Sequence, residues 1–321
     1  MAEITTWSVE PPQKGERLDV MLAQRFPDRS RASLQSLVKQ ALVTVNGLAA
    51  KPGYRLKVDD AIRVEIPNDP PPPSALAPTP MNMTILFEDD DLIAVNKPVG
   101  LVVHPGAGRE VETVVSSVLS HTALSPVGEP FRPGVVHRLD KGTSGVLILA
   151  KNEFAHQRLV KAFAGRKMEK EYLAIVQGHP ESETGRIEVA MERDRAQRQR
   201  MMATVAERGK PAVSLYEVLE QLPGAALVRI RILTGRTHQI RVHMAYIGHP
   251  LVGDTTYGGR TRSIGTGHFL HSRSLRFQHP RARTILQLEA PLPEAFEQAL
   301  AELRRQQTEE KKPGHLGKSR R

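Results

Sequence analysis

The sequence of 321 residues contains no cysteine. This absence excludes disulfide bonds, thiolate nucleophiles and zinc sites that need sulfur ligands. It also agrees with a reducing compartment, where disulfides do not persist. Redox chemistry through thiols is therefore excluded for this chain.

Long hydrophobic runs are missing too. No apolar stretch approaches the roughly 18 residues that a membrane-spanning helix needs. The N-terminus, with Trp7, Glu10 and Pro11, lacks the basic start and apolar stretch of a secretory signal peptide. Hydrophobic residues make up 40% of the chain, as in an ordinary globular protein. We therefore expect a cytoplasmic protein that has no membrane partner.

The glycine motifs that bind phosphate in nucleotide-dependent enzymes are also absent. The sequence has no Gly-x4-Gly-Lys-Ser/Thr, and Gly106-Ala107-Gly108 lacks the third glycine of a dinucleotide motif. His238 and His243 are five positions apart with no glutamate between them, unlike the His-Glu-x-x-His zinc pattern. The sequence thus predicts no nucleotide, no metal and no other cofactor.

Acidic residues are scarce in one long stretch of a basic chain. The formal net charge is +10 at pH 7, and positions 229 to 283 hold ten arginines, no lysine and a single acid, Asp254. Guanidinium groups bind phosphate bidentately and stack on bases, so this stretch favours RNA as a partner. A solvated basic face is the alternative interpretation.

A proline-rich segment divides the chain. Seven prolines between positions 67 and 80 predict an extended linker. Before it, residues 16–66 show helical spacing at 18–22 and again at 34–38 after Ser30, a candidate N-cap. Asn46-Gly47 predicts a tight turn, and 61–66 alternates like a half-buried strand. We predict a small α+β domain over 16–66.

Residues 81–307 predict a second, larger domain in which short apolar runs alternate with helical stretches. Expected strands cover 84–87, 92–96, 101–103, 145–150, 171–177, 213–219, 227–233 and 284–289. Expected helices cover 112–121, 153–164 after Asn152 as N-cap, 238–247 and 293–306. Because strands outnumber helices and long crossovers are few, we predict an α+β fold with a mixed, mostly antiparallel sheet and flanking helices. The basic tail, 308–321, is predicted to be disordered.

One loop concentrates polar groups between two apolar runs. It reads His137-Arg138-Leu139-Asp140-Lys141-Gly142-Thr143-Ser144-Gly145. A loop between rigid strands can present one carboxylate to a pocket, and the basic neighbours of Asp140 favour its ionised form. An ionised carboxylate can act as a nucleophile or stabilise a cationic sugar. A salt bridge or a turn cap is the structural alternative for this aspartate.

This loop resembles the catalytic motif of the RluA/RluD family of pseudouridine synthases, and the likeness is closest to the RluD type. Three further segments follow in the order and spacing of that family: Leu92–Pro98 with Leu101–Gly108, Lys170–Ala174, and Leu233–His243. The domain at 16–66 resembles a small RNA-binding domain first described in a ribosomal protein. The larger domain is then expected to have the pseudouridine synthase fold.

The resemblance implies catalytic roles for three residues. Asp140 would be the catalytic carboxylate, Tyr172 would stack on the target base and accept a proton, and Arg241 would pair with Asp140. Two alternatives stay open, because Tyr172 fits a core position on a strand and Arg241 could act only as a phosphate clamp.

The resemblance also implies RNA contacts. Arg138 would enter the RNA helix where the target base leaves, and we expect His137, Arg236 and His238 to contact RNA as well. The histidines could instead be structural groups whose ring nitrogens are satisfied within the protein.

The implied activity is isomerisation of uridine to pseudouridine, with large-subunit ribosomal RNA as the expected substrate and transfer RNA as the alternative. The reaction consumes no redox or energy cofactor, which agrees with the missing motifs. Two other classes remain: a non-catalytic RNA-binding or ribosome-assembly protein, and a hydrolase that uses Asp140 with a histidine and Ser144. No Gly-x-Ser-x-Gly elbow supports the hydrolase. We expect a monomer.

Overall fold

The computed structural model describes residues 3–26, 31–66, 76, 78–80, 83–105, 112–127, 132–197, 200–260 and 267–310. The chain divides into two compact units, Met1–Ala75 and Leu76–Arg321, and each has its own hydrophobic core. Ser30, most of the predicted linker at 67–80 and the tail from 311 onward lie outside the described residues.

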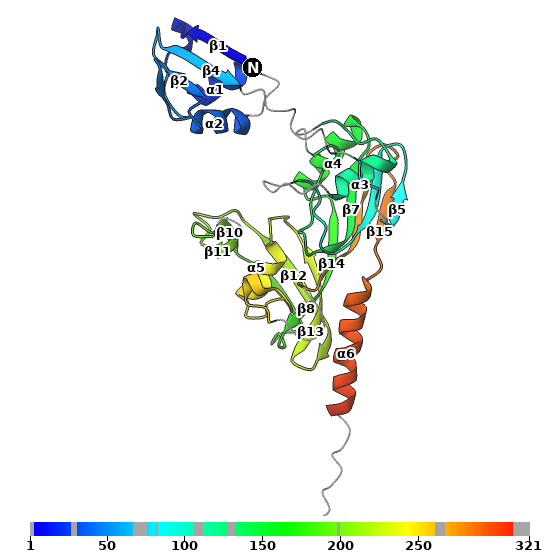
Figure 1. Cartoon of the computed structure of the whole chain (residues 1–321). Coiled ribbons are helices and arrows are strands. Elements are labelled where there is room, and N and C mark those ends of the chain that lie inside the picture. The colour runs from blue at the N-terminus through cyan, green and yellow to red at the C-terminus, as the bar shows by residue number, and fades with distance from the viewer. Residues whose placement is uncertain are drawn as a thin grey trace, which may run out of the picture. The chain divides into compact units, whose positions relative to one another are not determined.

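The first unit is a small sheet covered by two helices (Figure 1). Its elements are β1 (Glu3–Ser8), the 3-10 helix η1 (Pro11–Gln13), α1 (Leu18–Arg25), α2 (Arg31–Lys39), β2 (Val43–Val45), β3 (Leu48–Ala49) and β4 (Ala61–Ile66). The strands are antiparallel in the order β1-β4-β2-β3. The predicted turn is confirmed, since Asn46 and Gly47 join β2 to β3 with φ of 53° and 76°. Strand β1 was not predicted.

The second unit is built on one large sheet. Its strands are β5 (Ile85–Glu88), β6 (Leu92–Lys97), β7 (Ser144–Ala150), β8 (Glu169–Gln177), β9 (Thr184–Glu188), β10 (Ala190–Arg193), β11 (Met201–Thr204), β12 (Val213–Leu222), β13 (Ala225–Ile232), β14 (Leu270–Gln278) and β15 (Ile285–Glu289). Its helices are α3 (Val114–His121), α4 (Glu153–Ala164), α5 (Gln239–Tyr246), the 3-10 helix η2 (Thr255–Tyr257) and α6 (Glu294–Glu310).

The predicted α+β class is confirmed. The sheet order is β5-β6-β7-β14-β8-β13-β12-β9, with β15 against β14, and β10–β11 form a separate hairpin (Figure 1). Of the described strand pairs, β7–β14 is parallel and the others are antiparallel. Asn152 caps α4 as predicted, because its side chain accepts the Ala155 N–H. No described helix has the length and apolar character that crossing a membrane requires.

Three predictions about elements were wrong. The run 101–103 is not a strand, because the carbonyls of Val102 and Val103 accept the free N–H groups of Val114 and Val115 in the first turn of α3. Strands β9, β10, β11 and β14 were missed; in β14, buried polar residues such as His271 interrupt the apolar alternation. The tail predicted from 308 begins inside α6, which continues to Glu310.

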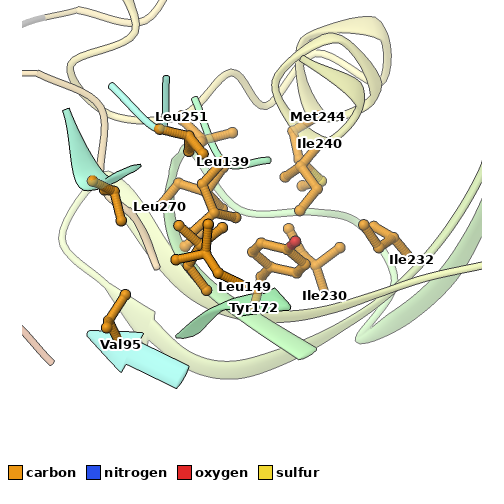
Figure 2. Close-up of a cluster of buried hydrophobic side chains, with 14 of the residues drawn as sticks. Val95, Leu139, Leu149, Tyr172, Ile230, Ile232, Ile240, Met244, Leu251 and Leu270 are labelled. Atoms are coloured by element: carbon orange, nitrogen blue, oxygen red, sulfur yellow. The ribbon is translucent and has the colours of Figure 1, made fainter. Parts of the chain in front are cut away.

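The core between the sheet and helix α5 supports two residues of the predicted site. Tyr172 of β8 is buried beside Ile230 of β13 and Ile240 of α5 (Figure 2). Leu139 is buried in the same cluster, near Leu270 of β14 (Figure 2). Because Leu139 anchors the loop, its neighbour Asp140 has a fixed place at the edge of this core.

A buried lysine holds the other side of that loop. Lys97, at the end of β6, is fully buried. Its ammonium group donates hydrogen bonds to three carbonyl oxygens, those of Pro98 (2.8 Å), Leu101 (2.7 Å) and Lys141 (3.2 Å). Burial lowers the pKa of Lys97 to about 7, and the charge of Asp140 opposes that shift. Lys97 thus ties the turn after β6 to the loop that carries Asp140.

Replacing Lys97 with methionine should therefore destabilise the second unit by about 3 kcal/mol, because buried carbonyls lose their donor. Urea denaturation followed by circular dichroism measures this loss of stability. Tryptophan fluorescence would instead report on the first unit, which contains the single tryptophan, Trp7. Lys161→Met on the exposed face of α4 is the control and should be nearly neutral. Equal stability of the two variants would contradict the anchoring role.

Candidate active site

All seven residues predicted for the site line one cavity of about 420 Å³. They are His137, Arg138, Asp140, Tyr172, Arg236, His238 and Arg241. The loop before β7, strand β8 and the start of α5 supply them from distant parts of the sequence. The volume lies in the range of pockets that hold small ligands, and it is large enough for one nucleoside.

Asp140 stands at the meeting point of two cationic or potentially cationic side chains. Its carboxylate is partly accessible, and Oδ2 lies 3.6 Å from Nη1 of Arg241 and 3.9 Å from Nε2 of His238. Its carbonyl accepts the N–H of Thr143 at 3.0 Å, which closes the turn. Both charged contacts are longer than a hydrogen bond, so the carboxylate faces the cavity beside Arg241 without being locked to it.

A second carboxylate holds Arg241 in place. Nε and Nη2 of Arg241 donate to Asp254 at 2.7 and 2.8 Å, and both side chains are buried. This bidentate pair leaves Nη1 to face Asp140. Burial works against the charged form of Arg241, but the hydrogen bond and charge of Asp254 outweigh it and raise the pKa of Arg241. Arg241 therefore stays charged at neutral pH.

The Tyr172 ring forms an aromatic wall of the cavity. Burial raises the pKa of Tyr172 to about 12, partly offset by a hydrogen bond with Ser272. The side chain is thus a neutral phenol at pH 7, with its hydroxyl next to β14. It can stack on a planar base and exchange a proton, but it is not a phenolate at rest.

The two histidines of the predicted set differ. His137 stacks on Phe163 with ring centroids 4.6 Å apart, and its Nε2 accepts the N–H of Ile148 at 3.0 Å. Burial, with a smaller effect of Lys170, lowers the pKa of His137 to about 3, so its ring is neutral. These contacts favour the structural interpretation for His137. His238, by contrast, faces the Asp140 carboxylate.

The two remaining predicted residues lie at the rim. Arg138 is exposed, and within the described part of the chain no hydrogen bond or ion pair holds its side chain. Among the described residues, the side chain of Arg236 donates only to a backbone carbonyl oxygen, that of Pro211, at 3.1 Å. Both guanidinium groups therefore keep an uncompensated positive charge at the cavity mouth.

Most of the arginine-rich stretch is not a free basic face. Six of its ten arginines are paired with carboxylates: Arg229 with Glu217, Arg231 with Glu171, Arg241 with Asp254, Arg273 with Glu289, Arg276 with Glu169 and Arg281 with Asp91. Apart from the buried Arg241–Asp254 pair, each of these pairs has an exposed partner and adds little stability, but each carboxylate repels a phosphate. Five of the six carboxylates lie outside positions 229 to 283, so the local charge count did not reveal them.

Several residues of the site were missed from the sequence. Asp254 stands out in the sequence only as the single acid of a basic stretch, and nothing there marks it as the partner of Arg241. Lys170 lies two positions before Tyr172, on the same face of β8, and lines the cavity. His268 bonds to Thr143 Oγ1 at 3.1 Å, and burial lowers its pKa to about 4. No sequence pattern pointed to His268.

The geometry does not favour a hydrolase. Ser144 is buried, and its Oγ lies 2.9 Å from Nδ1 of His271, whose Nε2 bonds to the carbonyl of Ala290. This serine does not reach the cavity beside Asp140. Among the described residues, no three histidine, aspartate or glutamate side chains are grouped to hold a metal ion.

Comparisons with known proteins agree with this geometry. Residues 91–246 match the family described as RNA pseudouridylate synthase, and residues 16–62 match the S4 domain. The Uncharacterized RNA pseudouridine synthase YlyB of Bacillus subtilis is 43% identical, over 91% of this chain and 96% of that protein. The Ribosomal large subunit pseudouridine synthase D of Vibrio cholerae is 40% identical, over 90% and 91%. The structure of Human RNA Pseudouridylate Synthase Domain Containing 4 superposes with a TM-score of 0.55 at 26% identity, over 68% of this chain and 92% of that one.

Proposed function

Since this chain belongs to the RNA pseudouridylate synthase family and is an RNA-modifying isomerase, we propose that it acts on large-subunit ribosomal RNA with Asp140 as its catalytic carboxylate. Tyr172 and Arg241 are the other proposed catalytic residues. The observation that supports this most is the placement of Asp140, 3.6 Å from Arg241 and in one cavity with Tyr172.

The reaction breaks the bond between N1 of uracil and C1′ of ribose and forms a bond between C5 and C1′. The Asp140 carboxylate either attacks C1′ or removes a proton from the adjacent C2′, and in both cases it supports departure of the base. After the uracil rotates, the hydrogen on C5 is lost and N1 gains one, so the net change is an isomerisation. Arg241, with Nη1 3.6 Å from Oδ2, orients the Asp140 carboxylate throughout.

Tyr172 retains the detached base and takes part in the last proton transfer. Stacking on its ring holds the free uracil while the cavity walls keep it from leaving. Because its pKa is about 12, the phenol accepts the C5 proton only as it passes its own proton to water. This route keeps the site free of a standing phenolate.

The source of the RNA is inferred from the relatives. Proteins named Ribosomal large subunit pseudouridine synthase D are 38 to 40% identical to this chain over 87 to 95% of its length. The S4 domain adds a second RNA-binding unit, which suits a large folded RNA. A ribosomal substrate would place the enzyme in the cytoplasm. We also propose that it works as a monomer.

Tritium release tests the proposal. RNA labelled with tritium at carbon 5 of uridine loses the label as pseudouridine forms, and large-subunit ribosomal RNA should be the active substrate. Release from transfer RNA alone would support the alternative substrate, and release from neither RNA would support a non-catalytic RNA-binding protein. Mapping pseudouridines in cells that lack the protein would then identify the positions.

The cations that remain unpaired indicate where RNA binds. Arg138, Arg166, Lys170 and Arg236 line the cavity, and none has a carboxylate partner within the part of the chain that the structure describes. On β8, Lys170 and Tyr172 alternate with Glu169 and Glu171, so the free cation and the paired glutamates point to opposite faces. We propose that Arg166, Lys170 and Arg236 bind the phosphates that flank the flipped uridine, and that Arg138 enters the RNA helix where the uridine leaves.

Removing one of these cations should flatten the salt dependence of RNA binding. Lys170→Ala and Arg166→Ala should each lower the slope of log affinity against log salt by about one. The matched control is Arg276→Ala, because Arg276 is neutralised by Glu169 and should leave the slope unchanged. Fluorescence anisotropy with a labelled RNA fragment at several salt concentrations measures the slopes. A larger change for Arg276 than for Lys170 would overturn the assignment.

A further inference from the structure

The Tyr257 hydroxyl links the β10–β11 hairpin to the imidazole beside Asp140. Tyr257 is buried, and its Oη accepts the backbone N–H of Met201 at 2.9 Å. The same oxygen lies 2.8 Å from Nδ1 of His238, whose Nε2 lies 3.9 Å from Oδ2 of Asp140. A single chain of polar contacts therefore runs from the backbone of β11 to the carboxylate.

Counting donors and acceptors places the hydrogen atoms in this chain. The Asp140 carboxylate can only accept, so the imidazole nitrogen that faces it is best protonated. A neutral ring carries one N–H, which leaves Nδ1 as an acceptor for the O–H of Tyr257. The Met201 N–H donates to a lone pair of Oη. The three protons of the chain, on Met201 N, Tyr257 Oη and His238 Nε2, then each have one acceptor. In the opposite tautomer, a lone pair of Nε2 would face the carboxylate and the phenol proton would have to find another acceptor.

The surroundings of His238 keep its ring neutral and oriented. Burial lowers the pKa of His238; Asp140 opposes this, and Arg241 lowers the pKa further. The charged and titratable groups that face the ring or its phenol partner are Asp140, Arg138, Arg241, Asp254, His268 and Arg200. The backbone of His238 is left-handed, with φ of 57°, and the ring meets Tyr257 edge-on at 82°. This backbone turns the ring from the start of α5 toward the loop of Asp140.

We propose that Tyr257 and His238 are positioning residues for Asp140. The phenol donates to Nδ1 and so keeps the imidazole proton on Nε2. The Nε2–H group then attracts Oδ2 of Asp140 toward the protein and leaves Oδ1 free to face the ribose. Arg241 reaches the same oxygen, Oδ2, from its own side. This inference rests on the proposed role of Asp140 as the catalytic carboxylate.

Nitrogen-15 NMR of histidine-labelled protein tests the tautomer directly. In the wild type, His238 should show a protonated Nε2 and an unprotonated Nδ1 near neutral pH. In Tyr257→Phe the donor to Nδ1 is lost, so Nδ1 is free to take a proton. The spectrum should then show either a second tautomer, with the proton on Nδ1, or a ring that becomes doubly protonated at a higher pH than in the wild type. A wild-type ring with its proton on Nδ1, or no difference in Tyr257→Phe, would overturn the proposal.

Kinetics test the positioning role. Tyr257→Phe should lower kcat roughly 10- to 100-fold, because a small misplacement of a reacting group is costly, while KM for RNA stays within about two-fold. If double protonation of His238 lowers turnover on the acid side of the pH profile, that side of the profile should move to higher pH in Tyr257→Phe. His238→Gln keeps a neutral donor near Asp140, so it should retain more activity than His238→Ala. Because glutamine does not titrate, this variant should also lose the pH dependence that comes from His238. Tyr246→Phe, an exposed hydroxyl on α5, is the control and should match the wild type.

Failure of this inference can be told apart from failure of the proposed function. The NMR assignment does not depend on turnover, and tritium release by the wild type reports the activity itself. If Asp140→Asn stays active, the proposed function fails whatever the tautomer of His238. If Tyr257→Phe does not fold, His238→Gln still decides, because equal activity of the Gln and Ala variants would exclude a donor at this position.

Discussion

Asp140→Asn should lower pseudouridine formation by about four orders of magnitude or more, while RNA affinity stays within a few-fold. The amide keeps the size and the polar contacts of the side chain but can neither attack C1′ nor accept a proton from C2′. The Asp140 side chain lies 3.6 Å from Arg241, and the short hydrogen bonds of Arg241 go to Asp254 instead. The loop should therefore keep its structure. Tritium release and anisotropy on the same protein sample measure the two effects.

A matched control is available for this substitution. Glu297→Gln on the exposed face of α6 makes the same carboxylate-to-amide change away from the cavity and should leave turnover unchanged. Wild-type turnover in Asp140→Asn would refute the catalytic assignment. A proportional loss of binding and turnover would instead mean that Asp140 serves RNA binding.

Removal of Arg241 should have the second-largest effect, because it leaves a buried charge without a partner. Asp254 is almost fully buried and Arg241 nearly so. Breaking a buried pair of this kind costs about 3 to 5 kcal/mol, so Arg241→Met and Asp254→Asn should each destabilise the second unit by that amount. Turnover of Arg241→Met should also fall by about 100-fold or more, as expected for loss of one preorganised donor. Urea denaturation and tritium release measure the two losses.

The double variant Arg241→Met/Asp254→Asn separates the two functions of the arginine. Neither charge is then left alone, so stability should recover in part, while Asp140 still lacks Nη1 and turnover should stay low. Arg304→Met serves as the reference, because its pair with Glu220 is exposed and should cost no more than about 1 kcal/mol. Near-normal turnover in the double variant would mean that Arg241 is purely structural.

Local sequence patterns predicted correctly those features that depend on interactions between residues close together in the sequence. The Asn46-Gly47 turn and the Asn152 cap were predicted because each depends on residues within three positions of itself. The family was predicted because its motifs are short and ordered, and the comparisons confirm it. The strand predicted at 101–103 was wrong for the opposite reason. The carbonyls of this run accept hydrogen bonds from a helix that begins eleven residues after it, and no strand pattern encodes such a contact.

The sequence by itself therefore determined the fold class, the family and seven of the side chains that line the cavity. Only the tertiary structure decided how their charges are paired. It paired Arg241 with Asp254, placed His238 between Tyr257 and Asp140, and paired arginines of the sheet with glutamates from distant strands. The reason is that electrostatic interactions depend on distances through space, and at 3 to 4 Å a partner from any part of the chain outweighs neighbours in sequence that point elsewhere.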